Sequence, residues 1–188
     1  MKNIYIVTPA ETRMGHLPHL AVLTKRGIWQ ASRVATTLET SFDLVLHAPI
    51  AGASQTAHLI AGAESPQSEE VPELRCAEND EAGRDVVTAQ RLLGGFAPPQ
   101  EYFLRGLEEP LRALAGVATS SIDNLTTSRN ARWTLIIADP LIAPLVAQSI
   151  AGEHHSPKRF IQRNLGPCQG YLLRSTNGNG FMSVTEIE

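Results

Sequence analysis

Short apolar runs alternate with stretches of helical periodicity along most of this chain. Three runs predict buried strands, at residues 4–7, 44–46 and 134–138. After each run, apolar positions recur three or four residues apart and predict helices at about 25–38, 51–61 and 141–151. Strands that alternate with helices are typical of a parallel sheet with helices on both faces. We therefore expect an α/β domain.

The middle and the end of the chain follow other patterns. Residues 64–80 are rich in Ser, Pro, Gln and Glu, which is typical of an exposed loop. Helices are expected over 81–93 and from Pro98-Pro99 to about Val117, with Pro110 kinking or splitting the second one. A further helix is expected to begin within 120–124. Near the C-terminus, strand candidates at 171–173 and 181–184 flank the turn signal Asn177-Gly178-Asn179-Gly180 and predict a hairpin.

The composition is that of a globular protein with one core. Its 188 residues, 43% of them hydrophobic and 19% charged, predict a single domain over 1–188. The formal net charge of -3 gives no indication of a nucleic-acid surface. No apolar run approaches the roughly 18 residues of a membrane span, and the N-terminus lacks signal-peptide features. We expect a cytoplasmic protein, with Cys76 and Cys168 as free thiols.

The end of the first strand carries a family resemblance. The chain reads Thr8-Pro9-Ala10-Glu11-Thr12 there, which resembles the Arg-His-Gly-Glu-Thr of the histidine phosphatase superfamily, the phosphoglycerate mutase-like enzymes. The order of later motifs is similar too. Residues 23–31, Leu-Thr-Lys-Arg-Gly-Ile-Trp-Gln-Ala, look like the family's Leu-Thr-x-x-Gly-x-x-Gln-Ala, and residues 47–57 look like the segment that ends in Gln-Thr-Ala.

The resemblance implies a fold and also a loss of chemistry. The fold would be a three-layer α/β sandwich with a mostly parallel central sheet and a helical cap inserted at about 64–130. In the family, an imidazole accepts the phosphoryl group, and two arginines and a second histidine complete the phosphate pocket. Here those positions hold Pro9, Thr8, Gly52 and Asp139, with Ala10 at the glycine. This chain therefore resembles a degenerate member that lacks the Arg-His-Gly motif.

The substituted positions would meet at the carboxyl ends of the strands, where ligands bind in open α/β sheets. Phosphate binding needs cationic side chains, whereas Asp139 would be an anion. A carboxylate about 4 Å from a phosphate charge costs on the order of 4 kcal/mol at an effective dielectric constant of 20. We expect no catalytic residue, cofactor or metal, and a pseudophosphatase that binds an unidentified small molecule or protein. The sequence leaves homo-oligomerisation open.

An active enzyme with a rebuilt pocket is the alternative. His47 follows the second strand and could act as a base or nucleophile, or could simply bond to the backbone. Asp139 could accept a phosphoryl group, although with Pro140 after it a helix cap explains it better. Glu73 and Glu78 are the candidates for the family's acid–base glutamate. His16 and His19 lack a third ligand that would predict a metal site.

Overall fold

The fold is built around one six-stranded sheet. The computed structural model describes residues 2–13, 21–38, 41–62, 65–66, 68–76, 81–93, 97–152, 155–175 and 183–188. The strand order is β3-β2-β4-β1-β5-β6, with β1 at Asn3–Val7, β2 at Leu44–His47, β3 at Glu69–Glu70, β4 at Trp133–Ile137, β5 at Gly170–Arg174 and β6 at Ser183–Ile187. Strands β3, β2, β4 and β1 run parallel, and β5 pairs antiparallel with both β1 and β6. The expected mostly parallel sheet is confirmed.

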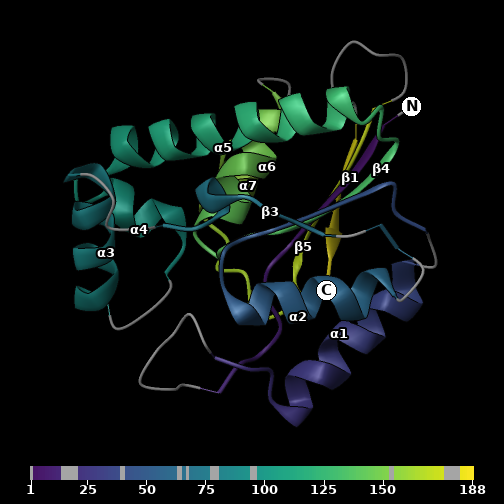
Figure 1. The fold of residues 1–188 in the computed structure, drawn as a ribbon. Helices are drawn as coiled ribbons and strands as arrows, with labels where there is room; N and C mark the ends of the chain where they lie inside the picture. The colour runs from purple at the N-terminus through teal and green to yellow at the C-terminus, as the bar shows by residue number, and fades with distance from the viewer. Residues whose placement is uncertain are drawn as a thin grey trace.

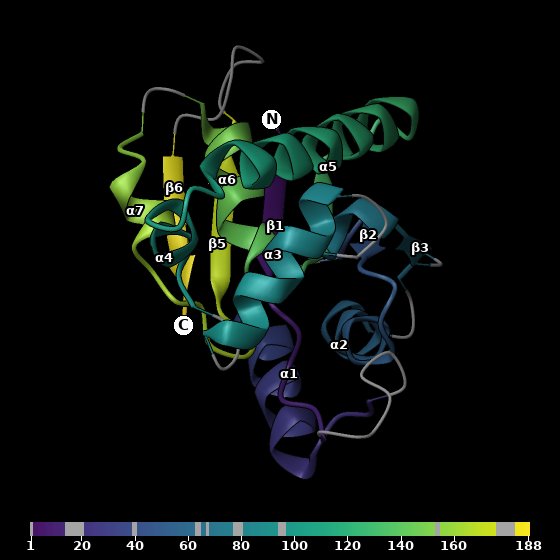
Figure 2. The same ribbon diagram turned by 90° about the vertical axis from the view of Figure 1, so that its left-hand side faces the viewer.

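Helices cover both faces of this sheet (Figures 1 and 2). Helices α1 (Lys25–Leu38) and α2 (Ala51–Ala61) lie together on one face. On the other face, α5 (Glu108–Ser128) packs against α6 (Ile142–Ala151), and α6 packs against the short α7 (Lys158–Ile161). Helices α3 (Glu81–Leu92) and α4 (Pro99–Phe103) lie where α5 begins. The three-layer α/β sandwich is confirmed.

The apolar runs form the inner strands because these are covered on both sides. All five residues of β1 are buried, and so are all four of β2. In the middle of β1, Tyr5 meets Phe42 edge-on and stacks on Trp133, with ring centroids 5.6 and 6.2 Å apart. Strands that are buried at every position are typical of a parallel sheet between two helical layers.

The prediction of one exposed loop over 64–80 was wrong in part. Residues 69–70 form β3, and a 3-10 helix, η2, follows at Pro72–Leu74. Val71, Leu74 and Cys76 are buried. Composition did not indicate these short elements, because polar residues separate the few apolar residues in this segment. The division into one domain with a cap over 64–130 stays a prediction.

The predicted helix breaks were also misplaced. Pro110 lies in the first turn of α5, where its missing N–H costs nothing, and the break precedes it, at 104–107. No new helix begins at 120–124, because α5 continues to Ser128. The hairpin partners are β5 and β6, with β6 beginning at Ser183; the predicted turn at 177–180 lies outside the described residues.

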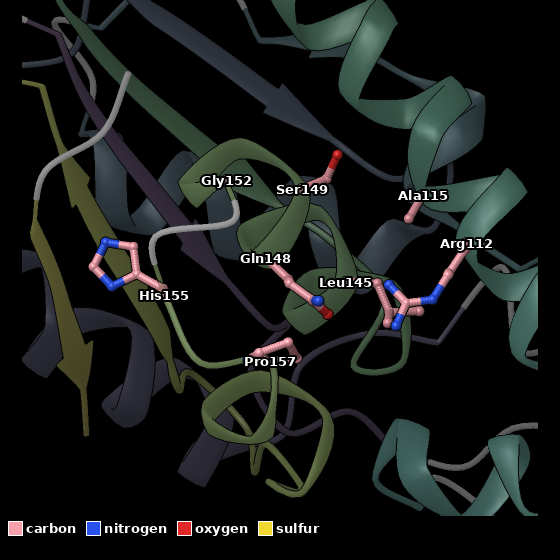
Figure 3. A pocket seen from close by; sticks show the side chains of 8 residues that line it. All are labelled: Arg112, Ala115, Leu145, Gln148, Ser149, Gly152, His155 and Pro157. Carbon is pink, nitrogen blue, oxygen red and sulfur yellow. The ribbon is translucent and has the colours of Figure 1, made fainter. Parts of the chain in front are cut away.

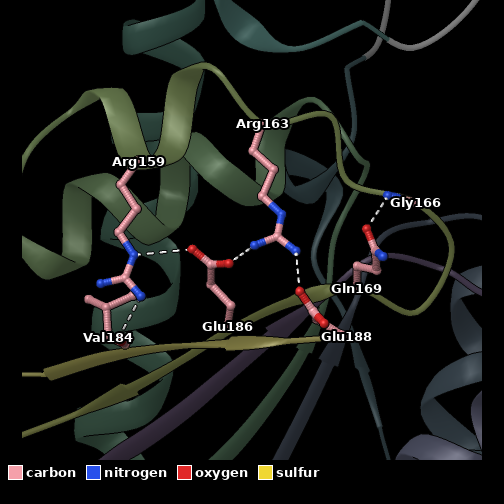
Figure 4. Close-up of polar contacts among 7 residues, drawn as sticks. All are labelled: Arg159, Arg163, Gly166, Gln169, Val184, Glu186 and Glu188. Atoms are coloured by element: carbon pink, nitrogen blue, oxygen red, sulfur yellow. Dashed lines mark hydrogen bonds and ion pairs between the residues drawn. The ribbon is translucent and has the colours of Figure 1, made fainter.

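The edge strand β6 is tied to the α7 region by charged side chains (Figure 4). Glu186 forms ion pairs with both Arg159 and Arg163, and Arg163 also reaches Glu188 at 3.4 Å. Arg159 donates to the Val184 carbonyl at 2.9 Å. These contacts attach the last strand to a helix that neither periodicity nor a cap signal predicted.

Both cysteines are buried and free, as expected. Across the described ranges, none of the helices combines the length and the apolar character that a membrane crossing needs.

Candidate functional site

A cavity of about 270 Å³ opens at the carboxyl ends of β1 and β4. Val7 and His47 both pair with Ile137, so the segments after β1, β2 and β4 leave the sheet at the same level. The structure brings Pro9, Ala10, Gly52 and Asp139 around this one cavity. The remaining lining residues are Glu11, Thr12, Ala21, Ile50, Pro140, Leu165 and Pro167. The predicted gathering of separated positions at one end of the sheet therefore occurs.

The loop after β1 is held by side chains of α2. Thr56 Oγ1 accepts from the Ala10 amide at 3.0 Å and donates to the Gly52 carbonyl at 2.6 Å. Gln55 Oε1 accepts from the Leu23 amide at 3.0 Å. The Gln-Thr pair of the family-like motif thus fixes both the cavity wall and the segment before α1.

The start of α1 holds the same loop from the other side. The Thr24 hydroxyl accepts from the Gly27 amide at 2.9 Å, as an N-cap side chain does, and donates to Glu11 Oε1 at 2.9 Å. Gln30 Oε1 accepts from the Glu11 amide at 3.1 Å. Gly27 must lack a side chain, because an added Cβ would overlap the Glu11 carbonyl oxygen. All these family-like residues serve to position the loop.

Thr8 and Pro9 supply no chemistry to the cavity. Thr8 is fully buried, and its hydroxyl donates to the Gly166 carbonyl at 2.6 Å, so the side chain ties the loop before β5 to β1. Pro9 lines the cavity with a ring that has no nucleophilic atom. Of the substituted positions, Thr8 is the one that does not line the cavity.

At Gly52, near the start of α2, the Thr12 side chain occupies the space that a side chain would need. A Cβ added at Gly52 would come within 2.5 Å of the Thr12 Cγ2 methyl. The Thr12 side chain therefore occupies the space through which any longer side chain at Gly52 would have to pass.

Asp139 is the buried charged residue of the cavity. It is 7% exposed, and its Oδ1 accepts from the Leu141 amide at 2.9 Å. Its carbonyl accepts from the Ala143 amide at 2.8 Å. The Asp139 side chain therefore holds the turn that leads into α6, with Pro140 inside that turn, while the helix itself begins at Ile142 and has Leu141 at its cap position. Burial raises the pKa of the Asp139 carboxyl from 3.8 to about 6, while the Leu141 hydrogen bond and nearby Arg75 act to lower it.

A second group of titratable residues lies behind Asp139. The Asp139 amide donates to the Leu74 carbonyl at 2.9 Å, which sets the end of η2 against the cavity. Burial, and then the Asp139 charge, raise the pKa of the Cys76 thiol well above its usual value. Burial likewise raises the pKa of Tyr102 to about 12. Both groups are neutral at physiological pH, so neither is an ionised nucleophile or base.

Of the other candidates, His47 and Glu73 do not line this cavity. His47 is buried, and its Nδ1 lies 2.8 Å from the Ala48 carbonyl oxygen, the backbone contact weighed against a catalytic role. Glu73 is half-buried in η2. Glu78, His16 and His19 lie outside the described residues. Within the ranges the structure describes, no three His, Cys, Asp or Glu side chains gather as metal ligands.

Sequence reasoning missed one wall of the cavity. Leu165 and Pro167 come from the segment before β5, which returns to the cavity because β5 pairs antiparallel with β1. Motifs after the parallel strands could not reveal this wall. The resemblance could have pointed to Glu11 and Thr12, since they belong to its first motif.

A second cavity, of about 340 Å³, lies between α5 and α6 and is drawn in Figure 3. Arg112 of α5 and His155, which follows α6, lie on opposite sides of it, with Gln148 between them. Because α6 runs back from the carboxyl end of β4, its C-terminal residues lie towards the other end of the sheet. This cavity is separate from the predicted site.

Known structures share this fold at low sequence identity. Phosphoserine phosphatase from Entamoeba histolytica is 15% identical with a TM-score of 0.67, over 98% of this chain and 96% of that one. Alpha-ribazole phosphatase from Shigella flexneri is 18% identical with a TM-score of 0.65, and the match covers 97% of this chain and 95% of that one. The protein histidine phosphatase SixA, complexed with tungstate, is 14% identical with a TM-score of 0.62, and the match covers 97% of this chain and 95% of that one. No protein-family model and no curated protein sequence matches the chain.

Proposed function

We propose that this chain, which has the phosphoglycerate mutase-like α/β fold of the histidine phosphatases that its motifs indicated, is a pseudophosphatase. It would be a binding module on that scaffold, without phosphatase chemistry. The carrying observation is the cavity lining. Around the expected phosphate site stand two carboxylates, Glu11 and Asp139, and no cationic side chain of the described residues. A transferred phosphoryl group needs a nucleophile and positive charge in its transition state.

The retained hydrogen bonds support binding rather than decay. Thr56, Gln55, Thr24 and Gln30 all bond to the backbone that shapes the cavity. A loop held this well keeps a preformed pocket, which is what a ligand site requires. The scaffold of the site is thus present while its phosphate-binding groups are replaced.

The test is the binding of phosphate and of vanadate, detected as a shift in the thermal unfolding of the protein at millimolar ligand concentrations. A ligand that binds only the native state raises its stability by mass action. We expect no saturable rise in melting temperature and no hydrolysis of an aryl phosphate, with or without divalent metals. A saturable rise that Ala21→Phe removes would contradict the proposal.

A rebuilt hydrolase remains the second candidate because of one observation. Asp139 is buried beside the cavity with a pKa of about 6, and a carboxyl tuned towards neutrality is typical of acid–base catalysts. Turnover across a panel of phosphoesters that is lost in Asp139→Asn would favour this enzyme. His47 has no such support, since it does not line the cavity.

A further inference from the structure

The candidate cavity is mostly apolar, with a carboxylate in its wall. Pro9, Ala10, Ile50, Pro140 and Leu165 supply hydrocarbon surface. Asp139 is the charged lining residue that is more than nine-tenths buried. Such a mixture of apolar walls and one placed polar group is typical of small-molecule sites.

One oxygen of the Asp139 carboxylate has no partner within the part of the chain that the structure describes. Oδ1 accepts from the Leu141 amide, but no hydrogen bond or ion pair there reaches Oδ2. Arg75 is close enough to act on the carboxyl through its charge, yet it forms no ion pair with it. A carboxylate in a largely apolar wall is unfavourable unless it is paired, so a cationic hydrogen-bond donor that reaches Asp139 from the cavity would be favoured.

The other charged group of the cavity has the same sign. Glu11 Oε1 accepts from the Thr24 hydroxyl, and Oε2 lies 3.6 Å from Arg26 Nε, which is itself largely exposed. The lining therefore presents two carboxylates to a ligand and no cation from the described residues. Cys76 and Tyr102, behind Asp139, are neutral. An anionic ligand is disfavoured here and a cationic ligand is favoured.

We propose that this cavity binds a compact organic cation, an ammonium group on a short hydrocarbon body. The ammonium donates to Asp139 Oδ2 and the hydrocarbon packs against the apolar walls. The cavity volume of about 270 Å³ suits a compact ligand. This inference rests on the proposed function and names its ligand class.

The test is an NMR titration of the ¹⁵N-labelled chain with three probes of nearly equal shape: isobutylammonium, isobutanol and isobutyrate. We expect saturable shifts of the Leu141, Gly52 and Ala10 amides with the ammonium, weaker binding of the alcohol and none of the carboxylate. Asp139→Asn keeps the acceptor for Leu141 and removes the charge. This variant should weaken the binding of isobutylammonium by about thirtyfold or more, since a charge pair is lost.

Two further variants keep the outcome interpretable. Asp123→Asn makes the same chemical change on the exposed face of α5 and should leave binding unchanged. Ala21→Phe, on the half-buried rim, fills the cavity without altering Asp139 and should also abolish binding. Equal affinity for alcohol and ammonium, or full binding by Asp139→Asn, would overturn the inference.

The failure of this inference can be told apart from that of the proposed function. Hydrolysis of an aryl phosphate, or saturable binding of inorganic phosphate in the cavity, would contradict the pseudophosphatase. Absence of both, together with no shift from isobutylammonium, would overturn only the cation site.

Discussion

At the scale of single residues, the positions that resemble the family divide into two groups. Thr24, Gly27 and Thr56 keep the family's residue type and hold backbone around the cavity. Pro9 and Asp139 depart from it and line the cavity itself. This division could be predicted from the sequence, because strand ends and a helix cap have recognisable patterns. The side-chain direction of Thr8 could not be predicted, since it depends on a hydrogen bond to the Gly166 carbonyl.

Replacing the missing nucleophile alone should not create a phosphatase. Pro9→His places an imidazole at the end of β1, but the cavity offers no cation of the described residues to orient a phosphate, and Asp139 repels it. Orientation and charge stabilisation are each worth several kcal/mol. Hydrolysis of an aryl phosphate by Pro9→His should stay at background. Clear turnover would mean that phosphate-binding groups exist in the pocket.

Asp139 should make stability depend on pH in an unusual direction. Because its pKa is raised from 3.8 to about 6, the native state binds more protons than the unfolded state between those values. The free energy of unfolding therefore falls by about 3 kcal/mol as the pH rises from about 4 to 6. Above that range the contribution of Asp139 to stability no longer changes with pH.

The measurement is urea unfolding of Asp139→Asn and of the unaltered chain from pH 4 to 8. The variant should match the unaltered chain near pH 4 and be more stable by about 2–3 kcal/mol at pH 7. Asp123→Asn, on an exposed helix face, is the control and should show no such trend. A variant that is destabilised equally at every pH would mean that only the helix cap matters.

At the scale of elements, helices with clear boundaries were predicted well. The predicted 25–38 and 51–61 match α1 and α2, since apolar periodicity marks both helices. Strand β3 and helices η2 and α7 are at most four residues long, too short for periodicity to show. Their shape comes from contacts with other elements, such as the bond from Asp139 to Leu74.

Two helical glycines should respond in opposite ways to alanine. Gly27→Ala in α1 would press a methyl against the Glu11 carbonyl and should destabilise the fold by about 2 kcal/mol or more. Gly116→Ala in α5 meets nothing within 4 Å and should stabilise it by about 0.5–1 kcal/mol. Denaturant midpoints of the two variants decide the matter. The same sign for both would show that the close approach at Gly27 is absent.

At the scale of the whole molecule, topology gathers what the sequence keeps apart. Strand β4 lies between β2 and β1, so residues near positions 10, 50 and 140 meet. That gathering could be predicted from the parallel strands. The wall from Leu165 and Pro167 could not, because it depends on the antiparallel return of β5.

The attachment of the edge strand should be sensitive to salt. Glu186→Gln removes the ion pairs to Arg159 and Arg163, which are partly shielded from water. We expect a loss of about 0.5–1 kcal/mol at low salt that shrinks at about 1 M NaCl. Glu108→Gln, which breaks the exposed pair with Arg112, should cost less. A salt-independent loss would point to packing instead.

The close approach of Thr12 to Gly52 constrains the order in which an arginine could be introduced at this site. An arginine at Gly52 would meet the Thr12 methyl at its first side-chain carbon, so that substitution is harmful until Thr12 becomes smaller or shifts. The two changes are coupled, and their effects cannot simply add. Converting the chain towards a phosphatase therefore needs a permissive first substitution at Thr12, in addition to the substitutions that introduce the phosphate-binding groups.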